Sequence, residues 1–413
     1  MKYTLLQINC ACNVSSTGKI AEDIGNLAQI DGYDSYITYA LKATRESQNK
    51  TIKIHNDTSF WFDVVERMVL DNKGLCRSSN RATRKLIADI ERINPDIIHL
   101  HTLHYHEVNC DLLWKYLAKK NIPVVYTLHD FWPFTGNCTY PIHFNCDKWQ
   151  TQCGLCPMPR SYKNSLFLDQ SARNLERKKK LLLNIPNLYI ITVSKWMEQQ
   201  VRKSFLKEKK IQTIYNGIDI NKFKRPTAEV IESVRSKYSI GSKFMMLGVA
   251  SSWSIRKGFN DYIRLSKSLN DDEVIVLVGL TAKLIKKLPR NIIGITRTND
   301  IMELAALYAA ADVVLNLSYA ETFGLTTVEG FACGTPCIGY NNTATPELIK
   351  ENTGFLIEQG DINALRNALN VVKIKTKEFF SESCIDYAHK CFDKDKNFQN
   401  YIQLYNKLLH KSR

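Results

Sequence analysis

Two glutamates in the C-terminal half of the chain have the spacing and surroundings of a binding site. Glu321 and Glu329 belong to the segment ETFGLTTVEGFACGTP, which follows a buried-looking strand and opens a helix that ends near Gly334. Eight helical residues rise about 12 Å and return the second carboxylate to the side of the first. Small residues between them leave backbone N–H groups open to an anion. One carboxylate can therefore accept hydrogen bonds from sugar hydroxyls, and the other can accept them from ribose hydroxyls. The backbone amides between them can bind a diphosphate. The alternative is a capped helix with two surface glutamates.

Four cysteines fall in a loop-like stretch rich in aromatic residues and proline. Cys138, Cys146, Cys153 and Cys156 have the spacing C-x7-C-x6-C-x2-C. Four thiolates can surround a tetrahedral metal ion, and a structural Zn²⁺ is the ion that this ligand set favours. Its binding would supply roughly 10 kcal/mol to order a segment with little regular structure. Free or disulfide-bonded thiols remain the alternatives, because the longer spacings are not those of a standard zinc knuckle.

The elements that must position these residues are short apolar, β-rich runs that alternate with helical patterns. The sequence therefore predicts an α/β fold with two doubly wound parallel sheets, whose ligands lie beyond the carboxyl ends of the strands. The strands are expected at residues 3–9, 35–39, 97–100, 124–128 and 189–193, and then at 244–249, 274–278, 292–296, 313–317 and 336–339. The expected domains are 1–205, with a cysteine-rich insertion at 136–160, then 206–390, and a C-terminal helix at 391–413.

Composition limits the class of protein. The 413-residue chain is 44% hydrophobic and 23% charged, which excludes a disordered chain. No apolar run approaches the 18 residues of a membrane span, and no signal-peptide core follows Met1, so we expect a cytoplasmic protein. Residues 171–211 hold eleven basic and three acidic residues, which is more than half of the net charge of +15. Its core, RKKK at 177–180, predicts contact with an anionic surface, and the alternative is a solvated helix face.

Several motifs together resemble the retaining family 4 glycosyltransferases. Glu321 and Glu329 reproduce the E-x7-E pattern of that family, within a string similar to its E-x-F-G … E-x-x-A-x-G-x-P. The motifs follow the family's order over nearly the whole chain. The cysteine-rich stretch is similar to an insertion found in a subgroup associated with exopolysaccharide and colanic-acid-type synthesis. The other matching motifs are Asn216-Gly217-Ile218-Asp219 with Phe223, Arg256-Lys257-Gly258, and Glu303-Leu304 through Tyr308 to Asp312.

The resemblance implies the GT-B fold, in which two Rossmann-like domains face a cleft and the C-terminal helix crosses back to the N-terminal domain. It also implies a UDP- or GDP-linked nucleotide sugar in the second domain, with the ribose on Glu329 and the diphosphate charge on Lys257. The family usually carries an arginine at the position of Ser252, so Arg256 is the expected replacement. The sugar and phosphates are assigned to Glu321 and to the amides near Phe323, Gly324, Leu325 and Thr326.

From the first domain, the resemblance implies contributions by Gly18 and His129. Gly18 lies in SSTGK at the start of a helix whose amides could approach a diphosphate, although the family commonly has two glycines there. His129 ends a strand and matches a family histidine that contacts the donor sugar, with a structural hydrogen bond as the alternative. His101 and His104 are candidates for contact with the acceptor.

The resemblance further implies transfer with retention of anomeric configuration and no protein nucleophile. His129, Lys257 and Glu321 are the expected catalytic residues, through charge and positioning. No convincing D-x-D motif is present, so no catalytic metal is expected. The expected acceptor is a lipid-linked saccharide of bacterial surface polysaccharide synthesis, used by a peripheral enzyme at the anionic inner face of the membrane. Two alternatives stay open: a GT-B-fold sugar-nucleotide epimerase, and a basic zinc-containing nucleic-acid-binding protein. The second leaves the Glu321 to Pro336 segment unexplained, and we expect no nucleic-acid partner.

Overall fold

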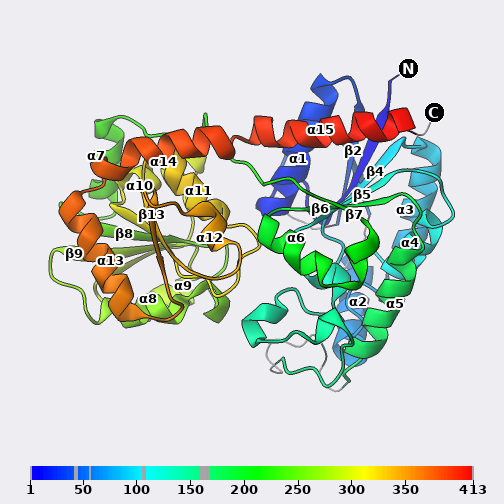
Figure 1. Ribbon diagram of the computed structural model, residues 1–413, viewed down its shortest axis with the longest axis horizontal. Coiled ribbons are helices and arrows are strands. Elements are labelled where there is room, and N and C mark those ends of the chain that lie inside the picture. Colours follow the sequence, from blue (N-terminus) through cyan, green and yellow to red (C-terminus); the bar gives the residue numbers. More distant parts are fainter. Residues whose placement is uncertain are drawn as a thin grey trace. The chain divides into compact units, whose positions relative to one another are not determined.

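The computed structural model describes residues 2–40, 45–54, 57–104, 108–158, 165 and 168–411 (Figure 1). The chain forms two compact units: the first runs to Ile214 and takes in the residues from Phe398 onward, and the second spans Tyr215–Asn397. The expected boundary at residue 205 differs from this division because one more strand, Lys210–Thr213, pairs with the first sheet. Residues 159–160 of the expected insertion and 412–413 of the expected C-terminal helix lie outside the described residues.

The first unit is built on a seven-stranded sheet whose neighbouring strands are all parallel. Leu5 and Leu6 of its central strand enter different hydrophobic clusters, so both faces of the sheet are buried. The edge strand at 50–53 is mostly exposed. Its sequence, KTIK, is largely polar and therefore does not predict a strand. In sheet order the strands are β3 (Lys50–Lys53), β2 (Asp34–Tyr39), β1 (Thr4–Ile8), β4 (Ile97–Leu100), β5 (Val124–Leu128), β6 (Leu188–Thr192) and β7 (Lys210–Thr213).

Helices cover both faces of the first sheet (Figure 1). One core packs against α1 (Ser15–Ile30) and the part of α15 (Lys394–Lys411) that belongs to this unit. The other core packs against α3 (Asn80–Ile93), α4 (Cys110–Leu117), α5 (Ser171–Leu183) and α6 (Lys195–Arg202). The remaining elements are α2 (Asp57–Leu70) and the 3-10 turns η1 (Trp132–Phe134), η2 (Pro141–Phe144), η3 (Lys148–Gln150) and η4 (Phe205–Glu208).

The second unit repeats this architecture on a six-stranded parallel sheet. In sheet order its strands are β10 (Ile292–Ile295), β9 (Glu273–Val278), β8 (Phe244–Val249), β11 (Val313–Asn316), β12 (Cys337–Tyr340) and β13 (Gly354–Ile357). Its helices are α7 (Ala228–Lys237), η5 (Ile255–Lys257), α8 (Phe259–Ser266), α9 (Ala282–Ile285), α10 (Ile301–Ala310), α11 (Leu325–Ala332), α12 (Thr345–Leu348), α13 (Ile362–Lys375) and α14 (Glu378–Cys391). Among the helices that the structure describes, none combines the length and apolar character needed to cross a bilayer.

Both sheets share one strand order, and this order determines where loops can gather. Each begins at a central strand, β1 or β8, adds two strands on one side, and then continues on the other side with β4 or β11. The order in which strands are added thus reverses between β1 and β4 and again between β8 and β11, while all strands stay parallel. In open parallel sheets, ligands bind in the crevice outside the carboxyl ends of the strands at such a reversal.

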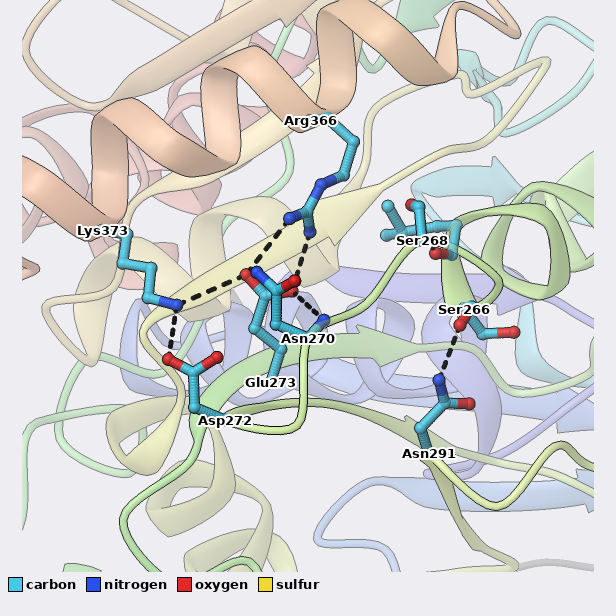
Figure 2. A network of polar contacts seen from close by, with 9 residues as sticks. Ser266, Ser268, Asn270, Asp272, Glu273, Asn291, Arg366 and Lys373 are labelled. Carbon is cyan, nitrogen blue, oxygen red and sulfur yellow. Dashed lines mark hydrogen bonds and ion pairs between the residues drawn. The ribbon is translucent and has the colours of Figure 1, made fainter.

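A polar network holds α13 against the start of β9 at the opposite edge of the second sheet (Figure 2). The Arg366 guanidinium donates to both carboxylate oxygens of Glu273, at 2.9 and 3.3 Å, and Glu273 is only 2% exposed. The Asn270 amide also donates to this carboxylate, at 2.9 Å. Burial raises the pKa of Glu273, but the hydrogen bonds from Arg366 and Asn270 outweigh burial and lower the pKa below its ordinary value.

We expect Arg366→Met to lower the free energy of unfolding by about 2 kcal/mol, because it removes the guanidinium that donates to both oxygens of a buried carboxylate. The more distant Lys373 ammonium, at 3.5 Å, is then the remaining cation beside Glu273. Because the pKa of Glu273 is lower in the folded than in the unfolded chain, its ionised carboxylate stabilises the fold at pH values above the unfolded pKa. This contribution is lost as the pH falls through the folded pKa. The difference between wild type and variant should therefore shrink in acid. Urea denaturation at several pH values measures it. Arg92→Met, which removes an exposed pair with Asp89, is the control and should change stability little.

Candidate functional site

The residues predicted to bind a donor gather where the strand order of the second sheet reverses. η5 follows β8, and the segment 317–324 follows the neighbouring strand β11. The two loops are joined by a hydrogen bond of 2.7 Å from the Tyr319 amide to the Arg256 carbonyl. Gly258 makes this approach possible, because its φ is +70° and an added Cβ would lie 2.0 Å from the Leu317 carbonyl oxygen. The close contact of the loops therefore requires a glycine at this position.

Two basic side chains of η5 reach the segment that carries Glu321. Lys257 forms an ion pair and a hydrogen bond with the Glu321 carboxylate, and Arg256 donates to the Ala320 carbonyl oxygen at 2.8 Å. Glu321 is 8% exposed, and burial raises its pKa, but the charges of Lys257 and Arg256 lower it below the ordinary value. Ser252, the position at which the resemblance led us to expect an arginine, is exposed. Arg256 thus points to the same segment as Lys257, although the two are adjacent in sequence.

The first turn of α11 supplies backbone donors beside this pair. Gly324 precedes the helix with φ +105°, and no side chain caps the helix start. The amides of Leu325 and Thr326 consequently face outward in the geometry that favours anions. Phe323 is buried and packs on the rings of Tyr215 and Phe392, at 6.0 and 5.9 Å between centroids. Its side chain therefore anchors the turn, and only its backbone is available to a ligand.

Glu329, one of the two glutamates that define the site, is oriented by a buried tyrosine. The Tyr308 hydroxyl on α10 donates to Oε2 of Glu329 at 2.7 Å. Burial and the adjacent carboxylate raise the pKa of Tyr308 well above its ordinary value, so the hydroxyl stays protonated and donates. Thr335 donates to the Tyr308 carbonyl oxygen at 2.6 Å and fixes the tyrosine in turn. Tyr308 stands in one of the motifs that resemble the family, but its role could not be read from the sequence because its partner is visible only in the fold.

In the first unit, two histidines lie at the carboxyl ends of neighbouring strands. His101 follows β4 and His129 follows β5, and their rings stack at 5.5 Å. Nδ1 of His101 lies 3.2 Å from Nε2 of His129, and Nε2 of His101 lies 3.0 Å from Oε1 of Gln7 on β1. Residues from three adjacent strands thus form one hydrogen-bonded chain.

The amide of Gln7 assigns the protons of this chain. Its Nε2 donates to the Ala21 carbonyl oxygen at 2.8 Å, so its Oε1 accepts from Nε2–H of His101. Burial lowers the pKa of His101 well below its ordinary value, so the ring is neutral and Nδ1 is an acceptor. His129 therefore donates through Nε2, and its Nδ1 carries the lone pair. Burial also lowers the pKa of His129 to about 4.

The other residues expected to contribute from the first domain have structural partners. His101 is buried with both ring nitrogens engaged, so it reaches a ligand only through His129. His104 is buried, stacks on Trp132 at 5.2 Å and lies 3.4 Å from the Asp130 carboxylate. Gly18 is buried in α1, where an added Cβ would lie 3.1 Å from the Ala11 side chain. The contacts expected of Gly18, His104 and His129 with substrates stay predictions.

Comparison with known proteins identifies the family. Residues 230–390 match the family described as glycosyl transferases group 1, and residues 38–222 match glycosyltransferase family 4. The chain belongs to the glycosyltransferases. The glycosyltransferase is 25% identical to the N-acetyl-alpha-D-glucosaminyl L-malate synthase of Bacillus anthracis, over 96% of this chain and 95% of the relative. It is 21% identical to the putative colanic acid biosynthesis glycosyl transferase WcaC of Escherichia coli, over 98% of this chain and all of WcaC.

Solved structures share the fold of this glycosyltransferase. Sucrose-phosphate synthase from Thermosynechococcus elongatus superposes with a TM-score of 0.75 at 16% identity, over 99% of this chain and 100% of that structure. HepE from Anabaena in complex with UDP-glucose superposes with a TM-score of 0.68 at 18% identity, over 98% of this chain and 99% of HepE. The prediction of a GT-B fold with two Rossmann-like units is confirmed.

We expect His129 of the glycosyltransferase to carry its proton on Nε2 from about pH 6 to 8, because its pKa of about 4 keeps it neutral there. Gln7→Leu removes the acceptor that fixes His101 and should produce a mixture of tautomers at His129. Long-range ¹H–¹⁵N spectra of histidine-labelled protein distinguish the two forms. Gln200→Leu, at a buried glutamine of α6, is the control. A wild-type His129 that titrates in the ordinary histidine range would contradict the assignment.

Proposed function

We propose that this glycosyltransferase moves a sugar from a UDP- or GDP-linked donor to a saccharide acceptor with retention of anomeric configuration. The observation that carries the proposal is the combination at the end of β11: a helix start without a side-chain cap, two nearby cations and two oriented glutamates. A nucleotide sugar has the complementary groups, because it joins an anionic diphosphate to two hydroxyl-bearing rings. HepE, which shares the fold, was solved with UDP-glucose, and starch synthase IV of Arabidopsis with ADP and acarbose.

In the proposed mechanism, the amides of Leu325 and Thr326, with Lys257 and Arg256, bind the diphosphate and stabilise its charge as the bond from the sugar C1 to phosphate breaks. The acceptor oxygen attacks C1 on the same face, and its proton passes to the departing phosphate oxygen. Glu321 binds sugar hydroxyls and Glu329 ribose hydroxyls, and neither acts as a nucleophile. His129 acts as a neutral hydrogen-bonding group toward the sugar. No step requires a catalytic metal.

We further propose that the acceptor is a lipid-linked saccharide of bacterial surface polysaccharide synthesis. Similarity to WcaC over the whole chain supports this choice, together with the cysteine-rich insertion that suggested the exopolysaccharide subgroup. The similarly long match to an enzyme named for L-malate makes a small carboxylate acceptor the second candidate. The epimerase and nucleic-acid-binding alternatives gain no support, because the family and relative matches are to glycosyltransferases.

The basic surface that could contact a membrane is smaller than the sequence predicts. Within RKKK, Lys178 is fully buried and Arg177 pairs with Asp111 at 2.9 Å, which leaves Lys179 and Lys180 exposed. The cluster is therefore a weaker surface charge than its sequence suggests. Helical periodicity is the reason, since position 178 falls on the buried face of α5.

The same unit carries an exposed apolar helix face that the sequence pattern did not indicate. On α2, Trp61 and Phe62 are 67% and 70% exposed, and Val65 and Val69 are also exposed. The end of α2 is tied to the start of α5, because the Gln170 side chain donates to the Leu70 carbonyl oxygen at 2.7 Å. We propose that α2 enters the interface of an anionic membrane while the exposed basic residues of α5 contact its headgroups.

A thermal-shift panel of nucleotide sugars tests the donor site, because a ligand that binds the folded state raises its stability. One UDP- or GDP-linked sugar should raise the melting temperature of the wild type. Glu329→Gln and Lys257→Met should each weaken its binding about tenfold or more, roughly 1.4 kcal/mol. Glu351→Gln, at an exposed glutamate of the same unit, should not. Sugar transfer that survives Glu329→Ala and Lys257→Ala unchanged would refute the proposed site.

Vesicle co-sedimentation tests the membrane surface. Lys179→Gln with Lys180→Gln should reduce binding to phosphatidylglycerol vesicles more than tenfold, since each lysine contributes roughly 1 kcal/mol. Trp61→Ser with Phe62→Ser should reduce it as well, through lost apolar contact. The control is Lys286→Gln with Lys287→Gln, an exposed lysine pair in the second unit. Equal sedimentation of all variants would exclude this surface.

A further inference from the structure

The four cysteines singled out by their spacing line a single small cavity in the first unit. Cys138, Cys146, Cys153 and Cys156 border a volume of about 30 Å³, and none forms a disulfide. They come from separate points of a segment that contains only short 3-10 turns. The spacing of the four cysteines in the sequence does not by itself require their side chains to meet at one cavity. We call these four side chains the cavity thiols.

Backbone geometry around the cavity is specialised at the C-x-x-C pair. Gly154 and Leu155, between its cysteines, have φ values of +135° and +45°, which turn the chain tightly between the two sulfurs. The Lys148 ammonium donates to the carbonyl oxygens of both residues, at 3.0 and 3.1 Å, and holds the turn. The Cys156 amide donates to the Asp169 carboxylate at 2.6 Å, which fixes the end of the turn.

A buried hydroxyl in the cavity wall points independently to a missing occupant. Oγ of Ser171 has no hydrogen-bond partner in the described part of the chain, and this residue is only 4% exposed. A buried hydroxyl without a partner lowers the stability of the fold. The Ser171 hydroxyl is a donor of the kind that metal-bound thiolates accept.

A buried cation near two of the cavity thiols supplies the charge that such a site needs. Lys178 is 0% exposed, and its ammonium donates to the Trp132 and Thr135 carbonyl oxygens at 2.7 and 3.1 Å and lies 3.6 Å from the Trp132 ring centre. Among the described residues, no carboxylate forms an ion pair with it. Thr135 links it to Cys138, because the Thr135 carbonyl oxygen accepts from Lys178 and the Thr135 hydroxyl donates to the Cys138 carbonyl oxygen at 2.7 Å. The charge of Lys178 also acts on the Cys138 and Cys153 thiols. A buried ammonium without an anion is costly, and thiolates beside it would remove that cost.

We propose that the cavity thiols bind one Zn²⁺ ion, releasing their protons, and that the buried ammonium of Lys178 offsets part of the resulting negative charge. Four thiolates and Zn²⁺ carry a net charge of 2−, and a tetrahedral sulfur site of this kind selects zinc. No three candidate ligands within the described residues already stand at metal-binding distances. Binding must therefore draw the four sulfurs inward around the small cavity. The ion would be structural, because four protein ligands leave no open position.

Elemental analysis of the full-length chain, purified without chelators, is the primary test. The wild type should contain about one zinc per chain. Cys153→Ser and Cys156→Ser should reduce this content to about a tenth or less. Cys391→Ser, at a partly buried thiol of α14, should leave it unchanged. A wild type with far less than one zinc, zinc retained by the cavity variants, or disulfides among the cavity thiols in the intact mass spectrum would each overturn the proposal.

Two further measurements keep the test decisive if the cysteine variants do not fold. Wild-type protein loaded with Co²⁺ should show the absorption of a tetrahedral thiolate site, and its absence would count against the proposal. Lys178→Met should weaken zinc binding about tenfold in competition with a chromophoric chelator. The neighbouring Lys179→Met removes an exposed lysine from the same helix and should leave the affinity unchanged. Equal affinity in both lysine variants would remove Lys178 from the site.

Discussion

Parallel pairing sends the carboxyl ends of all strands in a sheet to the same edge, and loops that leave this edge meet where the strand order reverses. In the second unit the loops after β8 and β11 meet in this way, and a single backbone hydrogen bond joins them. The pairing of Lys257 with Glu321 depends on that contact, as does the placement of Arg256 at the Ala320 carbonyl. In the first unit, Gln7, His101 and His129 come together for the same reason, since β1, β4 and β5 are neighbours.

Buried hydrogen bonds then fix the orientation of the side chains that meet at these strand ends. Tyr308 holds one oxygen of Glu329, and a chain that starts at Gln7 selects the protonated nitrogen of His129. In both cases the partner lies in the core, where an unmet hydrogen bond is costly and alternative orientations are therefore suppressed. A glycosyltransferase that works by positioning and charge depends on such fixed orientations.

Much of the fold was predictable because apolar strands are visible in sequence. The central strands lay where the pattern predicted them, whereas β3, β7 and β13 were missed. β3 and β7 are short, polar edge strands, and β13 is an edge strand of only four residues, GFLI. The glutamate pair and η5 stood out through spacing and resemblance. The partner Tyr308 and the engagement of both nitrogens of His101 could not be read from the sequence, because each is a contact between distant segments. The burial of Lys178 could have been found, since Asn174, Leu175 and Leu182 lie on the same helical face.

The ion pair between Lys257 and Glu321 means that the lysine of the second unit is not an unscreened positive charge. An anion that approaches Lys257 competes with a carboxylate already in place, and a bare phosphate offers that carboxylate nothing in return. A molecule that carries hydroxyl donors as well as phosphate can satisfy both partners at once. At the proposed donor site, the pair would disfavour the abundant simple anions of a cell and favour ligands with two complementary kinds of group.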